Sequence, residues 1–228
     1  MEAPGIVGGS KDKAKEFAAR LKELDKYEGF RNFARIYEKE KKYDLAEKEY
    51  KAAIVDFPEK INARFSLGYF YQNQKRFDEA FEVFEQMIAD SSENWGAFYQ
   101  VGRTGALSGQ NLDRAEACYK LYLQNERGPN NPSLASAHWR LGMVYEHKRQ
   151  NDLAGKEYRT ALKLDPELEQ AKKALKKLKV RIGYRNSTSP IGVLIVATNP
   201  GREDCLISSS TSKAAKLACT RSACGCSP

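Results

Sequence analysis

An internal repeat with a period of about 34 residues constrains the fold more than any other feature of this sequence. A small residue recurs at Ala34, Gly68, Gly102 and Gly142, at intervals of 34, 34 and 40 residues. The longer third interval is explained by extra residues in SGQNLDRA and NERGPNNPSL, which are both typical of turns. A chain that repeats at this period is predicted to stack several copies of one supersecondary unit.

Each copy has the apolar spacing of two helices joined by a polar turn. In the first half of the first copy, Phe30, Phe33, Ala34 and Tyr37 follow the i, i+3, i+4, i+7 pattern of one helix face. In the second half of every copy an alanine is followed by an aromatic residue four positions later and by a third column three positions after that. These columns are Ala46, Ala80, Ala115 and Ala154, then Tyr50, Phe84, Tyr119 and Tyr158, then Ala53, Met87, Tyr122 and Ala161.

An aspartate stands two residues before each of these alanines and is predicted to cap the second helix. The four aspartates are Asp44, Asp78, Asp113 and Asp152. A glutamate follows three residues after two of them, at Glu47 and Glu116, which predicts a capping box. Pro58 and Pro166 are predicted to end hairpins, because proline suits the first turn of a helix and not its interior.

The third copy departs most from the common pattern. Gly105 stands in the tyrosine column, and Arg127 stands where a proline is expected. We therefore expect the third copy to pack most loosely, and Pro129 and Pro132 to end its second helix a little late.

These columns resemble the tetratricopeptide repeat, a helix-turn-helix unit of 34 residues with Leu-Gly, Tyr, Ala, Phe and Pro positions. The resemblance implies an all-α fold, a right-handed α-α superhelix of four helical hairpins with flanking helices that cap the array. The implied organisation is a flexible N-terminus at 1–10, a helix at 11–26, units at 27–60, 61–94, 95–134 and 135–166, a capping helix at 167–182 and a low-order tail at 183–228.

The net charge of +8 belongs to the ends of the chain. Residues 27–166 hold 21 basic and 21 acidic side chains, whereas 167–182 hold six against two and 183–228 five against two. A solvated helix face explains lysines of this kind. An alternative is a scaffold that associates with nucleic acid, or with itself, through the basic C-terminal region.

No sequence motif indicates catalysis, so we do not expect an enzyme, a cofactor or a metal site. His138 and His147 are nine residues apart and do not share a helix face, and GRTGALSG falls in a predicted helix and turn. Four of the five cysteines lie in the tail, and Cys118 is expected to be reduced and buried. No signal peptide or transmembrane segment is visible, so we expect a cytoplasmic protein, or a periplasmic one if a signal peptide has been removed.

The resemblance implies that the first helices line a concave groove for a peptide or helix of a partner protein, and an acidic segment is one alternative. Aromatic, arginine and amide side chains occupy the groove positions, and the first two types dominate binding interfaces. The predicted groove residues are Arg31, Arg35, Asn62, Phe65, Tyr69, Tyr99, Gln100, Arg103, Trp139, Arg140 and Met143. Co-chaperone members of the family grip a terminal carboxylate with lysine, asparagine and arginine side chains. The matching positions here are Arg31, Arg35, Ser66, Gly96 and Gln100, and only the first two are basic.

Overall fold

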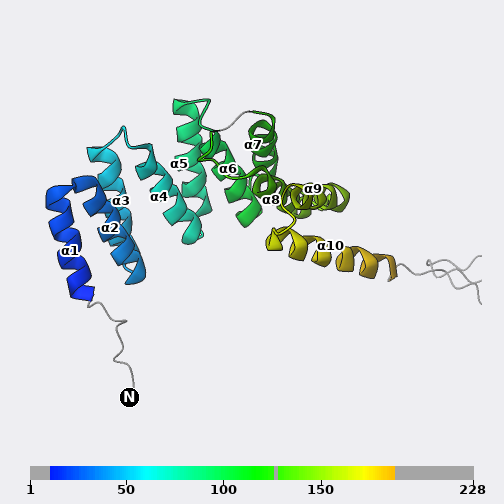
Figure 1. Cartoon of the computed structure of the whole chain (residues 1–228), viewed down its shortest axis with the longest axis horizontal. Coiled ribbons are helices and arrows are strands. Elements are labelled where there is room, and N and C mark those ends of the chain that lie inside the picture. Colours follow the sequence, from blue (N-terminus) through cyan, green and yellow to red (C-terminus); the bar gives the residue numbers. More distant parts are fainter. Residues whose placement is uncertain (1–10, 126–127, 188–228) are drawn as a thin grey trace, which may run out of the picture. The chain divides into compact units, whose positions relative to one another are not determined.

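The structure, a computed structural model, describes residues 11–125 and 128–187, which form ten α-helices and no strand. The helices are α1 (Lys11–Leu24), α2 (Lys26–Lys39), α3 (Tyr43–Asp56), α4 (Ile61–Asn73), α5 (Phe77–Asp90), α6 (Trp95–Ser108), α7 (Leu112–Gln124), α8 (Leu134–His147), α9 (Asn151–Leu164) and α10 (Glu169–Ser187) (Figure 1). The chain comprises two units, Met1–Leu175 and Lys176–Pro228, and α1 to α9 belong to the first. The predicted all-α fold is confirmed.

Helices α2 to α9 form four hairpins, one for each predicted repeat unit. The two helices of each hairpin pack against each other, and successive hairpins pack through α3 and α4, α5 and α6, and α7 and α8. Figure 1 shows this succession of neighbouring helices from α1 to α9. Because one hairpin cannot bury its apolar face alone, stacking supplies the core.

The repeated columns of the sequence form this core. The alanine of each second helix is fully buried, at Ala46, Ala80, Ala115 and Ala154. The aromatic residue that follows it lies directly over the small residue of the first helix. A Cβ atom on Gly102 would lie 2.6 Å from the Tyr119 ring, and Gly68 and Gly142 are covered in the same way by Phe84 and Tyr158. The glycine column therefore allows close contact between the two helices of a hairpin.

The predicted aspartate caps are wrong, because the second helices begin one residue before each aspartate. The residues at the cap positions are Lys42, Arg76, Asn111 and Gln150, and none of their side chains makes a capping hydrogen bond. The aspartates lie in the first helical turn instead. A negative charge at that position still interacts favourably with the helix dipole.

The predicted capping boxes are also wrong, because their glutamates bind the next hairpin. The Tyr71 hydroxyl donates a hydrogen bond of 2.9 Å to Glu47, and Arg76 donates another to the same carboxylate. Glu116 likewise accepts a hydrogen bond of 3.1 Å from Tyr145 and a second one from Lys148. These side chains link neighbouring units, which is a role that the spacing along one helix does not reveal.

The third hairpin is not loosely packed, contrary to the expectation from its unusual residues. A Cβ atom on Gly105 would lie 2.5 Å from Cβ of Ala115, so the absent tyrosine lets α6 and α7 approach each other closely. Helix α7 ends at Gln124 and is no longer than the other second helices, so its predicted late end is wrong.

Hairpin turns use left-handed backbone at equivalent positions. Lys41, Lys75 and Arg149 have φ angles of 59°, 59° and 60°. The third turn contains one extra residue and uses Gly109 and Asn111, with φ angles of 74° and 47°. Glycine and asparagine adopt this conformation at less cost than lysine or arginine.

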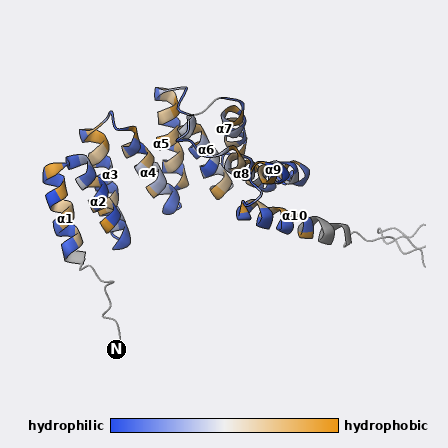
Figure 2. Cartoon of the chain, viewed as in Figure 1, coloured by the Kyte–Doolittle hydropathy of each residue, from blue (hydrophilic) through white to orange (hydrophobic). Residues whose placement is uncertain are grey.

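The flanking helices differ in detail from the prediction. Helix α1 packs against α2 and buries Ala18, whereas Phe17, one position before it, is 69% exposed. Helix α10 runs to Ser187, so residues 183–187 are helical and not part of the predicted tail. Residues 1–10 and 188–228, including the four tail cysteines, lie outside the described residues. No helix in 11–125 and 128–187 is long and apolar enough to cross a membrane, and most mix hydrophilic and hydrophobic residues (Figure 2).

Candidate partner-binding groove

Two adjoining depressions open between the first helices of the hairpins. One has a volume of about 560 Å³ and lies between residues of α2, α4, α6 and the turns before α6 and α8. The other has a volume of about 410 Å³ and is lined from α4, α6 and α8. Both include Tyr69 and Gln100, so we treat them together and call them the groove. The described lining residues are Arg31, Arg35, Asn62, Phe65, Ser66, Tyr69, Asn73, Glu93, Asn94, Trp95, Gly96, Tyr99, Gln100, Arg103, Asn130, Asn131, Pro132 and Arg140.

Aromatic side chains form the apolar part of the groove. Phe65 and Tyr69 lie one turn apart on α4, with stacked rings and 6.0 Å between ring centroids. Tyr69 remains 38% exposed, so part of its ring is open to a ligand. Tyr99 is buried, and its ring packs edge-on against Tyr119 of α7 with 5.6 Å between centroids. The rings therefore supply a rigid apolar surface with hydroxyl groups that donate and accept hydrogen bonds.

A buried amide network holds α4 and α6 together beneath the groove. Gln72 donates a hydrogen bond of 2.8 Å to the Thr104 hydroxyl, and both side chains are buried. Arg103 donates a hydrogen bond to the side-chain oxygen of Gln72. Gln100 donates one of 3.2 Å to the Tyr69 hydroxyl. Because buried polar groups are costly when unpaired, these bonds restrict the side chains to one arrangement.

Two arginines stand at the α6–α8 end of the groove. Arg140 donates a hydrogen bond from Nε to the Tyr99 hydroxyl at 3.1 Å, and its guanidinium lies 4.6 Å from the Trp139 ring centroid. The Arg103 guanidinium lies 5.8 Å from the Tyr69 ring centroid. Burial lowers the pKa of Arg103, and the positive charge of Arg140 lowers it further. Arg31, at the other end, forms an ion pair with Glu28.

Most of the predicted groove residues come together in this structure. Six of the eleven line the larger depression, and Tyr99, Arg103 and Arg140 line the smaller one. Trp139 and Met143 line neither depression. The five positions that correspond to the carboxylate-binding residues of co-chaperones also line the larger depression. These are Arg31, Arg35, Ser66, Gly96 and Gln100.

Several of the residues that line the groove were not predicted from the sequence. Asn94, Asn130 and Asn131 stand before first helices and not on them, so the helical register gave no indication of their place. Gln72 and Thr104, which lie beneath the groove and do not line it, were also not predicted, because they sit among apolar residues of first helices. A polar residue inside an apolar stripe was the available signal.

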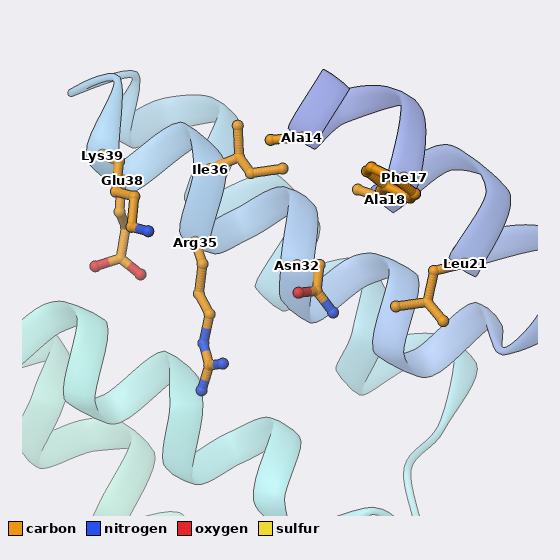
Figure 3. Close-up of a pocket in the computed structure, with 9 residues that line it drawn as sticks. All are labelled: Ala14, Phe17, Ala18, Leu21, Asn32, Arg35, Ile36, Glu38 and Lys39. Atoms are coloured by element: carbon orange, nitrogen blue, oxygen red, sulfur yellow. The ribbon is translucent and has the colours of Figure 1, made fainter. Parts of the chain in front are cut away.

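A further cavity of about 660 Å³ lies between α1 and α2. Apolar side chains of α1 line it, including Phe17 and Leu21, and Asn32, Arg35 and Ile36 line it from α2 (Figure 3). In Figure 3 the Arg35 side chain extends away from Phe17, and Arg35 also lines the groove. This residue thus connects the two regions.

The two histidines occupy separate structural positions. Nδ1 of His138 lies 2.6 Å from a carboxylate oxygen of Glu157, which places His138 in the contact between α8 and α9. Nε2 of His147 lies 3.1 Å from the carbonyl oxygen of Ala106. Within the described ranges, no group of three or more His, Cys, Asp or Glu side chains is arranged to hold a metal ion.

Comparison with known proteins identifies the repeat. Tetratricopeptide repeat models match residues 31–94 and 135–168. The chain is therefore a tetratricopeptide repeat protein, and its stacked hairpins form an α-solenoid. No curated protein matches it in sequence.

Solved structures with the same fold include three other proteins. YrrB, described as having an unusual peptide-binding site, is 19% identical with a TM-score of 0.55, over 73% of this chain and 84% of YrrB. TTC0263 of Thermus thermophilus, described as a thermophilic protein with this repeat, is 19% identical with a TM-score of 0.56, over 75% and 92% of the two chains. MamA is 18% identical with a TM-score of 0.53, over 67% and 86%. At these identities the likeness concerns the fold alone.

Proposed function

We propose that the protein is a non-catalytic scaffold or adaptor whose groove binds a peptide or helical segment of a partner protein. Repeat solenoids generally use the surface formed by successive units to bind extended partners. The observation that carries the proposal is that Tyr69, Gln100 and Arg103 meet in one opening and are held by partly buried hydrogen bonds. Preorganised side chains lose little entropy when a ligand binds.

The larger depression supplies the contacts that a peptide needs. Phe65 and the open part of the Tyr69 ring offer an apolar surface for a side chain. Asn62 and Asn131 line the same space, and amide groups can donate to and accept from a peptide backbone. In ligand sites generally, apolar lining provides contact area and a few polar groups fix the orientation of the ligand.

The ionisable groups support binding rather than catalysis. Burial raises the pKa of Tyr69, so its hydroxyl stays neutral near pH 7 and serves as a hydrogen-bonding group. Among the described residues that line the groove, Glu93 is the one carboxylate. General acid-base catalysis requires a group that titrates near the working pH, and arginine does not.

A displayed library of random peptides, selected on the full-length protein, tests the proposal. Selected peptides are then titrated against two variants, Tyr69→Ala in the groove and Tyr43→Ala on α3. The two tyrosines are both 38% exposed, so they form a matched pair. We expect Tyr69→Ala to weaken binding about tenfold or more, and Tyr43→Ala to leave it within about twofold.

Helical circular dichroism of both variants checks that the fold is retained. Equal affinities for the two variants would place the binding surface elsewhere on the solenoid. A selection that yields no peptide above background on the intact protein would argue against peptide binding altogether.

A further inference from the structure

Three arginines that line the groove, Arg35, Arg103 and Arg140, form no ion pair with a carboxylate of the described residues, and the last two line the smaller depression together. Within this part of the chain, neither Arg103 nor Arg140 has an acidic side chain within ion-pair distance, whereas five other arginines do. These others are Arg20, Arg31, Arg64, Arg76 and Arg114, and they pair with glutamate or aspartate. We propose that Arg103 and Arg140 form an oxyanion subsite, which binds a carboxylate or phosphate group carried by the peptide in the groove. This inference rests on the proposed function.

The charge of the smaller depression favours an anion. Its lining consists of Tyr69, Asn73, Tyr99, Gln100, Arg103 and Arg140, so the described lining residues carry two positive charges and no negative one. Two like charges in a partly buried space repel each other, and burial weakens their hydration. A bound oxyanion would relieve both effects.

The hydrogen bonds of the two guanidinium groups leave donors available. Arg103 is held from one side by the side-chain oxygens of Gln72 and Gln100. Arg140 is held through Nε by Tyr99, whereas its Nη1 atom is buried and has no hydrogen-bond partner among the described residues. An unsatisfied buried donor costs free energy, and a carboxylate or phosphate oxygen at this atom would satisfy it. The planar guanidinium group of arginine presents paired N–H donors that match two oxygen atoms of a carboxylate or a phosphate.

The position of the subsite favours an anion that belongs to a peptide. The smaller depression shares Tyr69 and Gln100 with the larger one, where Phe65 and Asn62 offer apolar and amide contacts. A segment bound along α4 and α6 would therefore place one of its residues beside Arg103. Arg103 and Arg140 are also separate from the five positions that match the carboxylate grip of co-chaperones, which all line the larger depression.

Blocked tripeptides distinguish the possible sources of the oxyanion. Three anionic probes are acetyl-Gly-phosphoserine-Gly-amide, acetyl-Gly-Glu-Gly-amide and acetyl-Gly-Ser-Gly with a free terminal carboxylate, and acetyl-Gly-Ser-Gly-amide is the neutral probe. The protein is the unaltered full-length chain, whose two tryptophans are Trp95 and Trp139. Because the Arg140 guanidinium lies 4.6 Å from the Trp139 ring, binding is expected to change Trp139 emission. Calorimetry at constant ionic strength provides an independent readout.

We expect at least one anionic probe to bind with saturation, and the neutral probe to give no saturable signal. Arg103→Gln and Arg140→Gln should each weaken that binding about tenfold or more. Arg140→Lys, which keeps the charge and loses the planar fork, should weaken it less. Arg159→Gln, at an exposed position of α9, is the control and should bind as the parent does. The probe that binds most tightly identifies the source of the anion.

Circular dichroism and thermal melting of each variant show whether its fold is intact. The subsite is overturned if no anionic probe binds up to about 50 mM, or if the two glutamine variants bind as tightly as the parent. If selected peptides bind in the groove but with no dependence on Arg103 or Arg140, the proposed function stands and the subsite does not.

Discussion

The Tyr71 hydroxyl of α4 donates a hydrogen bond of 2.9 Å to the Glu47 carboxylate of α3, and so joins the second hairpin to the first. The same pair of residue types recurs at Tyr145 and Glu116, with 3.1 Å between the atoms. A basic side chain shares each carboxylate. Since the units are held together by contacts between neighbours only, such links affect the cooperativity of the whole array.

Removing the charge of Glu47 should destabilise the protein. Glu47→Gln keeps the size of the side chain but leaves Arg76 without one of its carboxylate partners, so we expect a loss of about 1–3 kcal/mol in the free energy of unfolding. Urea denaturation measures this loss. Glu82→Gln, an exposed glutamate on α5, is the control and should stay within about 0.5 kcal/mol of the parent. A loss of equal size in both variants would contradict the role assigned to Glu47.

The same carboxylates predict how stability depends on pH. Burial by itself raises the pKa of Glu47, but hydrogen bonds from Arg76, Lys51 and Tyr71 outweigh it and lower the pKa from 4.5 to about 2. Glu116 also has a pKa of about 2. The folded state then binds fewer protons than the unfolded state, so this stabilisation is complete above about pH 5 and is lost as the pH falls towards about 2. Urea denaturation at several pH values should give a shallower decline for the Glu47→Gln, Glu116→Gln double variant than for the parent. An identical decline would show that other groups control acid stability.

The repeat columns predicted the hairpins because each column corresponds to one close contact between packed helices. Ala80, Phe84 and Gly68 occupy a single packing arrangement that recurs in the third and fourth units, so periodicity alone placed them. The glutamates at the unit boundaries were assigned to caps because a pattern along one helix contains no information about the neighbouring hairpin. Glu47 satisfies the spacing of a capping box yet bonds to Tyr71 and Arg76.

The groove was predictable to the extent that it follows the helical register. Phe65, Tyr69 and Gln100 stand on first helices at fixed offsets from the glycine column, and they line the groove. Asn131 comes from an inserted turn with no counterpart in the other units, so no register could place it. Gln72 required knowledge of what faces it on α6.

Substitution of the glycine column should be costly in proportion to how closely an aromatic ring covers it. Gly142→Ala would push a Cβ atom into the Tyr158 ring, so we expect a loss of about 1–3 kcal/mol in the free energy of unfolding. A Cβ atom on Gly128 meets nothing within 4 Å, so Gly128→Ala is the matched control and should be nearly neutral. Chemical denaturation of both variants is the measurement. A neutral Gly142→Ala would mean that α8 and α9 can move apart without loss.

Cys118 should resist thiol reagents as long as the protein is folded. The side chain is fully buried, and burial raises the pKa of its thiol to about 12, so little thiolate forms at neutral pH. The experiment uses a variant in which the other four cysteines are serine, with iodoacetamide labelling followed by mass spectrometry. We expect labelling only after denaturant is added. Rapid labelling of the native variant would show that the α7 region opens without global unfolding.

The hairpin turns carry a consequence for how the array comes apart. Lys41, Lys75 and Arg149 hold a left-handed backbone that long side chains adopt at a cost, whereas the third turn uses Gly109 and Asn111, which suit it. In a linear array each hairpin contributes its own stability to that of the whole array, so the least stable hairpin determines where unfolding starts. Hairpins with strained turns stand on both sides of the third hairpin. The unit that departs most from the repeat pattern thus has the most relaxed turn, and fraying is expected to advance inward from the terminal units and reach the third hairpin last.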